Sequence, residues 1–248
     1  MCGRYVAAAP PSEIAKYFGA APPTETVLEP SYNVAPTNEV YAVVERGDER
    51  RLEPLRWGLV PLWAKDIAIG SKMINARAEG VATKNAYRHA FRKQRCLIPA
   101  DGFFEWKVIE GPEPRSVGGR SGRVRKQPIY IHRVDGEPLA FAGLWETWRG
   151  PDRNGEPLYT CTIITTTANE TMAPVHNRMP VILPPDRWEQ WLDPEMQDTD
   201  ALARLLVPAP PSLLTLYPVS TAVNHVRNKG AELIEPYVDA PDPGQLAL

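Results

Sequence analysis

"QPIYIHRVDGEPLAFAGLWE" (residues 127–146) is the stretch of sequence that decides the fold class. Two runs rich in β-branched and aromatic residues, 127–134 and 138–146, have the composition of strands. The tetrapeptide Asp-Gly-Glu-Pro at 135–138 lies between them and is a typical hairpin turn signal. Runs of the same type occur at 39–45, 158–166 and 180–183. The chain is therefore predicted to consist mainly of antiparallel strands.

Helical segments are fewer. Residues 11–19 begin with Pro and end at Gly, and they carry apolar side chains at helical spacing. Further candidate helices lie at 83–94, 184–192 and 199–206. Because strands and helices do not alternate regularly, the order argues against a doubly wound parallel sheet and predicts an α+β fold with mainly antiparallel pairing. No linker separates two regions of different composition, so we expect a single domain.

The composition is that of an ordinary globular protein. Of its 248 residues, 43% are hydrophobic and 23% are charged, and no apolar run reaches the roughly 18 residues of a membrane span. Residues 1–20 lack a secretory signal, and the three scattered cysteines form neither a zinc motif nor a disulfide framework. We expect a cytoplasmic protein with free thiols and no metal. The formal net charge of -2 excludes a uniformly basic surface, so any nucleic-acid site must be a local patch.

Two segments have the composition of disorder. Residues 110–127 are rich in Gly, Ser and Pro, and the part from Arg115 to Lys126 carries basic residues without an acid. This predicts a flexible basic insertion, which is either a solvated surface loop or a mobile arm that touches phosphates through charge alone. Residues 239–248 are predicted to form a disordered tail, to which we assign no role.

The position of Cys2 directly behind the start methionine raises the first question of chemistry. Removal of Met1 would leave a 1,2-aminothiol whose amine (pKa about 7.7–8.0) and thiol (about 8.5) both reach nucleophilic form near neutral pH. Such an amine can act as the base for its own thiol, which then cleaves amides. Alternatively, the amine condenses with an aldehyde and the thiol closes on the imine carbon to form a thiazolidine. A cysteine at this position can also be accidental.

Residues 73–79 place Asn75, Arg77 and Glu79 two positions apart. On an extended segment these polar side chains would share one face, with apolar residues on the other. The same pattern also fits a plain exposed strand edge. The segment is therefore a candidate site only in the company of other polar groups.

Glu105 and His176 are the other candidate catalytic groups. Glu105 stands among Phe103, Phe104 and Trp106, and such surroundings raise the pKa of a carboxyl group, as a general acid requires. The alternative is a salt bridge to a buried arginine. His176 lies at a loop-to-strand junction, where functional sites gather, although a lone histidine is usually structural.

These segments resemble the SOS response-associated peptidase (SRAP) family, and the similarity covers most of the chain. The matching motifs are "MCGRY" (1–5), "YNVAPT" (32–37), "RWGLVPLWAK" (56–65), "INARAE" (74–79), "RCLIPADGFFEWK" (95–107), "HNRMPVIL" (176–183) and "VSTAVN" (219–224). The resemblance implies one SRAP domain over residues 1–238, with a barrel-like β core and peripheral helices.

The resemblance also implies a function. Similar proteins recognise abasic sites in single-stranded DNA, where the ring-opened sugar bears an aldehyde. The N-terminal cysteine traps that aldehyde as a thiazolidine, a DNA–protein crosslink that shields the strand. Because an imine can also cleave the strand by β-elimination, in competition with ring closure, we expect AP lyase activity as a side reaction. For this chain we accordingly expect a monomer associated with the nucleoid, no cofactor, and single-stranded DNA or a single-strand/double-strand junction as partner.

By the same resemblance, Cys2 supplies the amine and thiol. Asn75 hydrogen-bonds the Cys2 end, Glu105 accepts and returns protons, and His176 protonates the sugar oxygen. The residues expected to bind DNA are Arg4, Arg77 and Arg178, which hold phosphates, and Trp63, which is exposed and contacts a base.

The remaining tryptophans and cysteines are expected to be structural. Trp145 is assigned to the core, Trp188 and Trp191 to helix packing, and Cys96 and Cys161 to buried strands. Two other functions stay open: a thiol peptidase that uses Cys2 as its nucleophile, and a reader of DNA junctions that forms no covalent bond.

Overall fold

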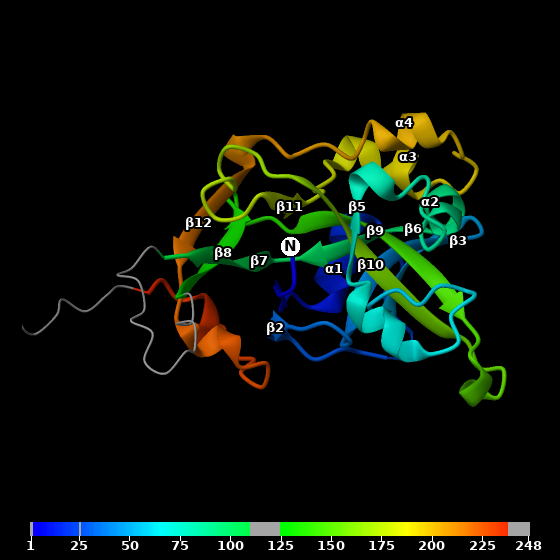
Figure 1. Cartoon of the computed structure of the whole chain (residues 1–248), viewed down its shortest axis with the longest axis horizontal. Coiled ribbons are helices and arrows are strands. Elements are labelled where there is room, and N and C mark those ends of the chain that lie inside the picture. The colour runs from blue at the N-terminus through cyan, green and yellow to red at the C-terminus, as the bar shows by residue number, and fades with distance from the viewer. Residues whose placement is uncertain (1, 25, 110–124, 238–248) are drawn as a thin grey trace, which may run out of the picture.

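The computed structural model describes residues 2–24, 26–109 and 125–237 (Figure 1). The expected basic insertion lies outside these residues up to position 124, and so does the whole expected tail at 239–248. In the part of the chain that is described, every helix is too short or too polar to cross a membrane.

Among the described residues, one sheet has five strands in the order β12-β8-β7-β1-β2, all antiparallel. These strands are β12 (Leu214–Pro218), β8 (Lys126–Arg133), β7 (Gly102–Val108), β1 (Tyr5–Ala7) and β2 (Ser31–Val34). Tyr5 of β1 pairs with Phe103 of β7. The residues before Tyr5 therefore run alongside β7.

The strands of the second sheet close into a barrel within the described part of the chain. Its order is β10-β4-β3-β6-β9, and β9 pairs again with β10. The barrel strands are β3 (Glu39–Arg46), β4 (Glu49–Trp57), β6 (Arg95–Ala100), β9 (Leu139–Trp148) and β10 (Leu158–Thr167). Their pairs are antiparallel except β4–β10, which confirms the expected α+β fold with a mainly antiparallel, barrel-like core.

Two short strands extend β10 beyond the barrel. β5 (Asn75–Arg77) runs parallel to β10, and β11 (Arg178–Pro180) runs antiparallel to it. The C-terminal half of β10 thus carries both segments in which the sequence placed polar candidates, the one around Asn75 and the one around His176.

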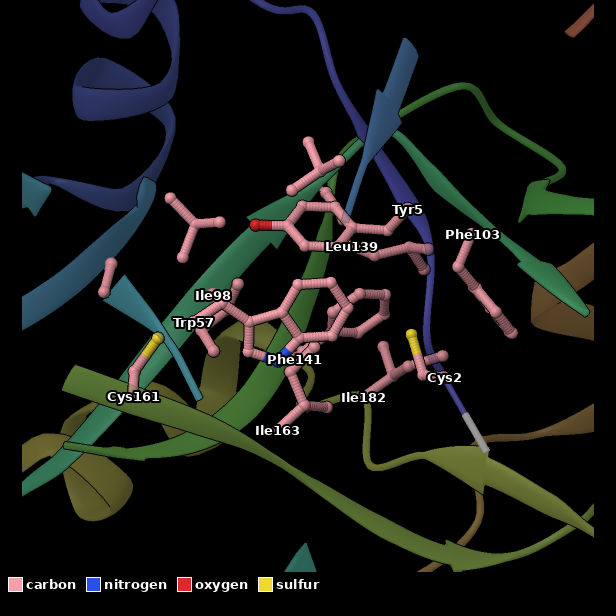
Figure 2. Packing of buried hydrophobic residues seen from close by; sticks show 14 of the residues in the cluster. Cys2, Tyr5, Trp57, Ile98, Phe103, Leu139, Phe141, Cys161, Ile163 and Ile182 are labelled. Atoms are coloured by element: carbon pink, nitrogen blue, oxygen red, sulfur yellow. The ribbon is translucent and has the colours of Figure 1, made fainter. Parts of the chain in front are cut away.

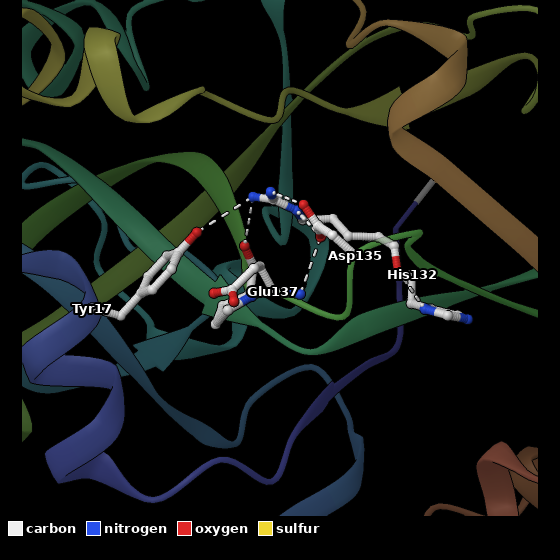
Figure 3. Close-up of polar contacts among 6 residues, drawn as sticks. Tyr17, His132, Asp135 and Glu137 are labelled. Carbon is white, nitrogen blue, oxygen red and sulfur yellow. Dashed lines mark hydrogen bonds and ion pairs between the residues drawn. The ribbon is translucent and has the colours of Figure 1, made fainter.

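The prediction of a hairpin with its turn at 135–138 is wrong. β8 pairs with β7 and β12 in the first sheet, whereas β9 belongs to the barrel, so the turn crosses from one sheet to the other. Arg133 holds this crossing, because its guanidinium donates to both carboxylate oxygens of Asp135 at 2.9 and 2.5 Å and to the Tyr17 hydroxyl at 3.4 Å (Figure 3). Turn composition alone does not determine which strands pair.

The burial of β9 explains why its sequence is almost continuously apolar. Leu139 and Phe141 point into the barrel interior, where they meet Tyr5 and Trp57 (Figure 2). Ala140, Ala142 and Leu144 of the same strand face the outside of the barrel and pack in a second cluster that includes helix side chains. A strand buried on both faces has no polar face, so a strict alternation of polar and apolar residues is lost.

The helices are short and cover the outer face of the barrel. They are α1 (Pro11–Phe18), α2 (Arg88–Lys93), α3 (Trp188–Leu192) and α4 (Thr199–Ala203). Short 3-10 segments lie at Ile67–Lys72, Ala78–Gly80, Pro151–Arg153, Pro185–Arg187, Pro211–Leu213, Thr221–Asn224 and Ala231–Ile234. Trp145, Trp188 and Trp191 are buried, as are Cys96 and Cys161, which confirms their expected structural places.

Candidate active site around Cys2

Cys2 is fully buried just before β1 and belongs to the cluster that fills the barrel. Figure 2 shows it in this cluster together with Phe103 and Ile182. Burial raises the pKa of the Cys2 thiol, the charge of Glu105 raises it further, and the backbone N–H of Arg4 lowers it. Burial thus favours the neutral thiol over the thiolate at this position.

The Asn75 side chain is hydrogen-bonded directly to the Cys2 backbone. Its Nδ2 donates to the Cys2 carbonyl oxygen at 2.8 Å. The parallel pairing of β5 with β10, in which Asn75 lies opposite Ile163, brings the amide to this point. Its Oδ1 is buried and has no hydrogen-bond partner among residues 2–24, 26–109 and 125–237. This amide therefore fixes the backbone of Cys2 and keeps one acceptor available beside it.

Glu105 reaches the same place from β7 and is 3% exposed. The Phe104 N–H donates to the Arg4 carbonyl at 3.0 Å, so Glu105 runs beside the residues that precede Arg4. The charge of Glu105 contributes to the raised pKa of the Cys2 thiol, in keeping with its place beside the segment that carries Cys2. The structure thus brings Cys2, Asn75 and Glu105 together from β5, β7 and the segment before β1.

His176 lies in the loop between β10 and β11 and is held by its neighbour Arg178. The Arg178 backbone N–H donates to His176 Nδ1 at 2.9 Å, while the Arg178 carbonyl oxygen lies 3.2 Å from the same nitrogen. A backbone N–H can only donate, and the contact with it is the shorter one, so Nδ1 is the acceptor. The neutral ring then carries its proton on Nε2.

The Arg178 side chain forms a two-pronged ion pair with Glu79. Its Nη1 and Nη2 lie 2.6 and 3.0 Å from the two Glu79 carboxylate oxygens, and Nη2 also donates to the Thr165 carbonyl at 2.6 Å. These hydrogen bonds lower the pKa of Glu79. The guanidinium expected to hold a phosphate is thus engaged with β10 and with Glu79.

The other expected DNA contacts differ in exposure. Arg4 is partly buried, and its Nη1 donates to Asn33 Oδ1 and to the Val223 carbonyl, both at 2.8 Å. Arg77 is exposed on β5, next to Asn75, and Trp63 is 55% exposed. Arg77 and Trp63 are therefore open to a ligand, whereas Arg4 mainly ties β1 to the chain around Val223.

Sequence reasoning missed several residues that shape the site. Asn33 is fully buried and donates to the carbonyls of Val223, His225 and Asn228, and Trp106 Nε1 donates to Asn224 Oδ1 at 2.7 Å. Both asparagines lie inside motifs that carried the family resemblance, but no chemistry pointed to them. Both act by holding the 219–228 region against the first sheet, since Asn33 lies on β2 and Trp106 on β7.

A groove of about 1190 Å³ adjoins Trp106 and contains cationic and aromatic side chains. Its lining includes Trp106, Arg125, Lys126, His225 and Tyr237. Trp106 directly follows Glu105 in β7, so the two side chains lie on opposite faces of that strand.

Comparisons with known proteins point to one family. A family model described as "SOS response associated peptidase (SRAP)" matches residues 1–226. The chain is 43% identical over 236 residues to the abasic site processing protein YoqW of Bacillus subtilis (strain 168), covering 95% of this chain and 99% of that protein. It is 34% identical over 208 residues to the abasic site processing protein YedK of Escherichia coli (strain K12), covering 83% and 84% of the two chains.

Solved structures agree on the fold. A crystal structure of a protein from Bacteroides thetaiotaomicron superposes with a TM-score of 0.80 at 23% identity, covering 96% of this chain and 100% of that one. A protein from Bordetella bronchiseptica superposes with a TM-score of 0.71 at 28% identity, covering 88% and 100%.

Proposed function

Because the chain belongs to the SOS response-associated peptidase (SRAP) family, we propose that it processes abasic sites in single-stranded DNA and bonds covalently to the damaged sugar through Cys2. The relatives named abasic site processing proteins support the substrate. The observation that supports the covalent step is the position of Cys2. Its carbonyl oxygen accepts a hydrogen bond from Asn75 Nδ2 at 2.8 Å, and the charge of Glu105 raises the pKa of its thiol.

The chemistry begins once Met1 has been removed. The Cys2 amine attacks the C1′ aldehyde of the ring-opened sugar, and the adduct loses water to form an imine. The thiol then adds to the imine carbon, its proton passes to the nitrogen, and the C–S bond completes a thiazolidine ring. The balance is one aldehyde plus one aminothiol giving one thiazolidine and one water, with no oxidant or reductant.

Each neighbour of Cys2 has a role in this sequence. Glu105 accepts a proton as the amine attacks and returns it when water leaves. It also takes the proton of the thiol, whose raised pKa makes such a base necessary. Asn75 keeps the terminal backbone in place, and Nε2–H of His176 donates to the sugar oxygen as the ring opens.

The function is tested with a single-stranded oligonucleotide that contains one abasic site. The protein should convert it to a product that migrates more slowly on a denaturing gel. A strand cut at the lesion would reveal lyase activity, and the same assay on a duplex with a single-stranded overhang would reveal junction preference. Intact oligonucleotide after prolonged incubation with protein whose N-terminal residue is Cys2 would contradict the proposal.

Trp63 is proposed to stack on a base that flanks the lesion. Its replacement by Ala should weaken binding of a single-stranded oligonucleotide by about tenfold, since one base–aromatic stack contributes about 1–3 kcal/mol. Fluorescence anisotropy at fixed salt measures this change. Leu62 is the matched control, because it is the neighbouring residue and is also 55% exposed. An equal loss in Leu62→Ala and Trp63→Ala would show that only general apolar contact matters there.

Glu79 is proposed as a positioning residue for His176. Glu79 holds the Arg178 side chain, and the Arg178 backbone N–H holds His176 Nδ1 as an acceptor. Glu79→Gln should therefore slow crosslinking by about tenfold, the effect of losing roughly 1.4 kcal/mol of interaction with a charged group. Nitrogen-15 NMR of the histidine rings should also show that His176 loses its uniform Nε2–H tautomer.

The matched control for Glu79→Gln is Glu53→Gln, which breaks a comparable two-pronged ion pair with Arg46 on the strands β3 and β4. It should change neither the crosslinking rate nor the His176 signals. A slower rate in Glu79→Gln with an unchanged His176 tautomer would refute the positioning role and leave the proposed chemistry untouched.

A further inference from the structure

A second polar cluster lies on α2, which Figure 1 places away from the marked N-terminus, on the side of the molecule that carries α3 and α4. A pocket of about 410 Å³ is lined by Arg88, His89, Arg92, Lys93 and Gln197. No carboxylate is among these lining residues. The pocket therefore concentrates positive charge on a chain whose formal net charge is -2.

The two arginines and the lysine of this pocket are not paired with carboxylates in the described part of the chain. Among residues 2–24, 26–109 and 125–237, neither Arg88, Arg92 nor Lys93 takes part in an ion pair. Six other arginines of the described chain, Arg46, Arg50 and Arg178 among them, do face a carboxylate. Like charges on one helix repel each other at neighbouring turns. An anion in the pocket would remove this repulsion.

His89 is backed by a carboxylate that the proposed chemistry at Cys2 does not use. Its Nδ1 lies 3.1 Å from Oε1 of Glu146 on β9, and Glu146 is only 2% exposed, whereas the His89 side chain is 54% exposed. Burial raises the pKa of Glu146, and the contact with His89 lowers it. Within the described residues Oε2 of Glu146 has no hydrogen-bond partner. Burying a carboxylate is costly unless it stabilises a positive charge.

This arrangement fits one kind of ligand. With Nδ1 donating to Glu146, the other ring nitrogen, Nε2, is the one available to a ligand in the pocket, and a protonated His89 can donate from it while Glu146 stabilises the ring charge. Arg88 and Arg92 lie four residues apart, so both side chains can reach the same group. Guanidinium and imidazolium groups together bind the oxygens of a tetrahedral oxyanion.

We propose that the α2 pocket binds a phosphate group, with Arg88, Arg92 and Lys93 as cations and the Glu146-backed His89 as an additional donor. The pocket shares no residue with the Cys2 site, and the proposal does not depend on the reaction there. The phosphate can belong to a DNA backbone held beyond the lesion or to a small phosphate compound. Both present the same oxygens, and the test distinguishes them.

The primary test is a titration of the full chain with inorganic phosphate, followed by NMR of the histidine rings. The chain has only four histidines, so the His89 signals are assigned with a His89→Gln variant. The His89 signals should shift and saturate, while those of His132 should not. Arg92→Gln should weaken phosphate binding about tenfold, because a hydrogen bond to a charged group is lost. Arg187→Gln, which changes an exposed arginine outside the pocket, should leave it unchanged.

The direction in which Glu146→Gln changes phosphate affinity decides between two roles of Glu146. If only the sum of charges mattered, removing a nearby negative charge would strengthen phosphate binding. If Glu146 acts by accepting from His89 Nδ1 and so fixing the ring in place, the same change weakens binding by several-fold, and His89→Gln weakens it equally. Tighter binding by Glu146→Gln would overturn the role of this pair, and an absence of saturable His89 shifts in the unaltered protein would overturn the site.

The source of the phosphate follows from a second titration with undamaged oligothymidine. If the pocket holds a DNA backbone, the oligonucleotide shifts the His89 signals, and Arg92→Gln lowers the salt dependence of DNA affinity by roughly one phosphate contact. If the ligand is a small phosphate compound, inorganic phosphate shifts His89 and the oligonucleotide does not. Crosslinking at Cys2 is scored separately in the same variants, so a failure of the proposed chemistry is distinguishable from a failure of the site.

Discussion

Cys2→Ala is expected to abolish the denaturation-resistant product with an abasic oligonucleotide, lowering its yield by at least about two orders of magnitude, as loss of a covalent nucleophile does. The thiazolidine needs an amine and a thiol on adjacent carbons of one residue. Cys96 and Cys161 cannot substitute, because each lies inside a strand with its nitrogen in a peptide bond and therefore presents no free amine. DNA binding should persist, since the alanine variant keeps Asn75, Arg77 and Trp63. Quantified denaturing gels give the yield, and anisotropy gives the binding.

Two companion variants separate the nitrogen from the sulfur. An N-terminal extension that keeps the Cys2 nitrogen in a peptide bond should eliminate the product although the thiol is present. Cys2→Ser retains the amine, so it should still form an imine that borohydride traps, without the stable product. Full crosslinking by the variant with the N-terminal extension would contradict the aminothiol proposal, because no imine can form from an amide nitrogen.

Much of the fold was predictable because the barrel strands are buried on both faces. β3, β9 and β10 appear in the sequence as apolar runs at almost their observed bounds. β4 did not, because it alternates Arg and Glu with leucines and contains Pro54. Its pairing with β10 is confined to Arg56 and Trp57, so the missing N–H of Pro54 disturbs no ladder on that side.

The failed hairpin at 135–138 has a different cause. Local turn chemistry was correct, since Gly136 has a φ of 77° and Asp135 accepts from the Glu137 N–H. What the turn could not reveal is that β8 finds partners on both edges, β7 and β12, within its own sheet. The choice of strand partners is a long-range property that depends on the whole core.

The candidate site divides in the same way. Cys2, Asn75 and Glu105 could be selected as candidates from residue types and from the family resemblance, and the structure shows a hydrogen bond between Asn75 and the Cys2 backbone. The partners of the arginines could not be inferred. Arg178 meets Glu79 across 99 positions of sequence, and Arg4 meets Val223 across 219. Nothing local in the chain distinguishes an arginine that holds DNA from one that holds the protein together.

Arg95 shows the second kind of arginine most clearly, and its replacement is expected to have the largest effect on stability. The residue is 2% exposed, and its guanidinium donates to the carbonyls of Phe91, Arg92, Trp191, Asp193 and Met196. Burial lowers its pKa to about 10, which still leaves it charged at neutral pH. This one side chain joins the C-terminal end of α2 to the end of α3 and the loop after it, on the outside of β6.

Arg95→Ala should reduce the free energy of unfolding by about 4 kcal/mol or more, since each buried carbonyl left without a donor costs about 1–3 kcal/mol and water can satisfy only some of them. That is a large part of the free energy of unfolding of a typical folded domain, which is roughly 5–15 kcal/mol. The free energy of unfolding of Arg95→Lys should lie between those of the unaltered protein and Arg95→Ala, because an ammonium group keeps the charge but has only three donors. Urea unfolding followed by tryptophan fluorescence measures all three proteins.

Arg133→Ala is the matched control, because that guanidinium also makes several hydrogen bonds but holds a turn between the sheets with a partner, Asp135, that is 47% exposed. Its loss should cost only about 1 kcal/mol, since the carboxylate and the turn carbonyl are resolvated. If Arg95→Ala unfolded at nearly the same urea concentration as the unaltered protein, the carbonyl groups around Arg95 would have to be reached by water. The guanidinium would then occupy the space between α2 and α3 without stabilising their packing.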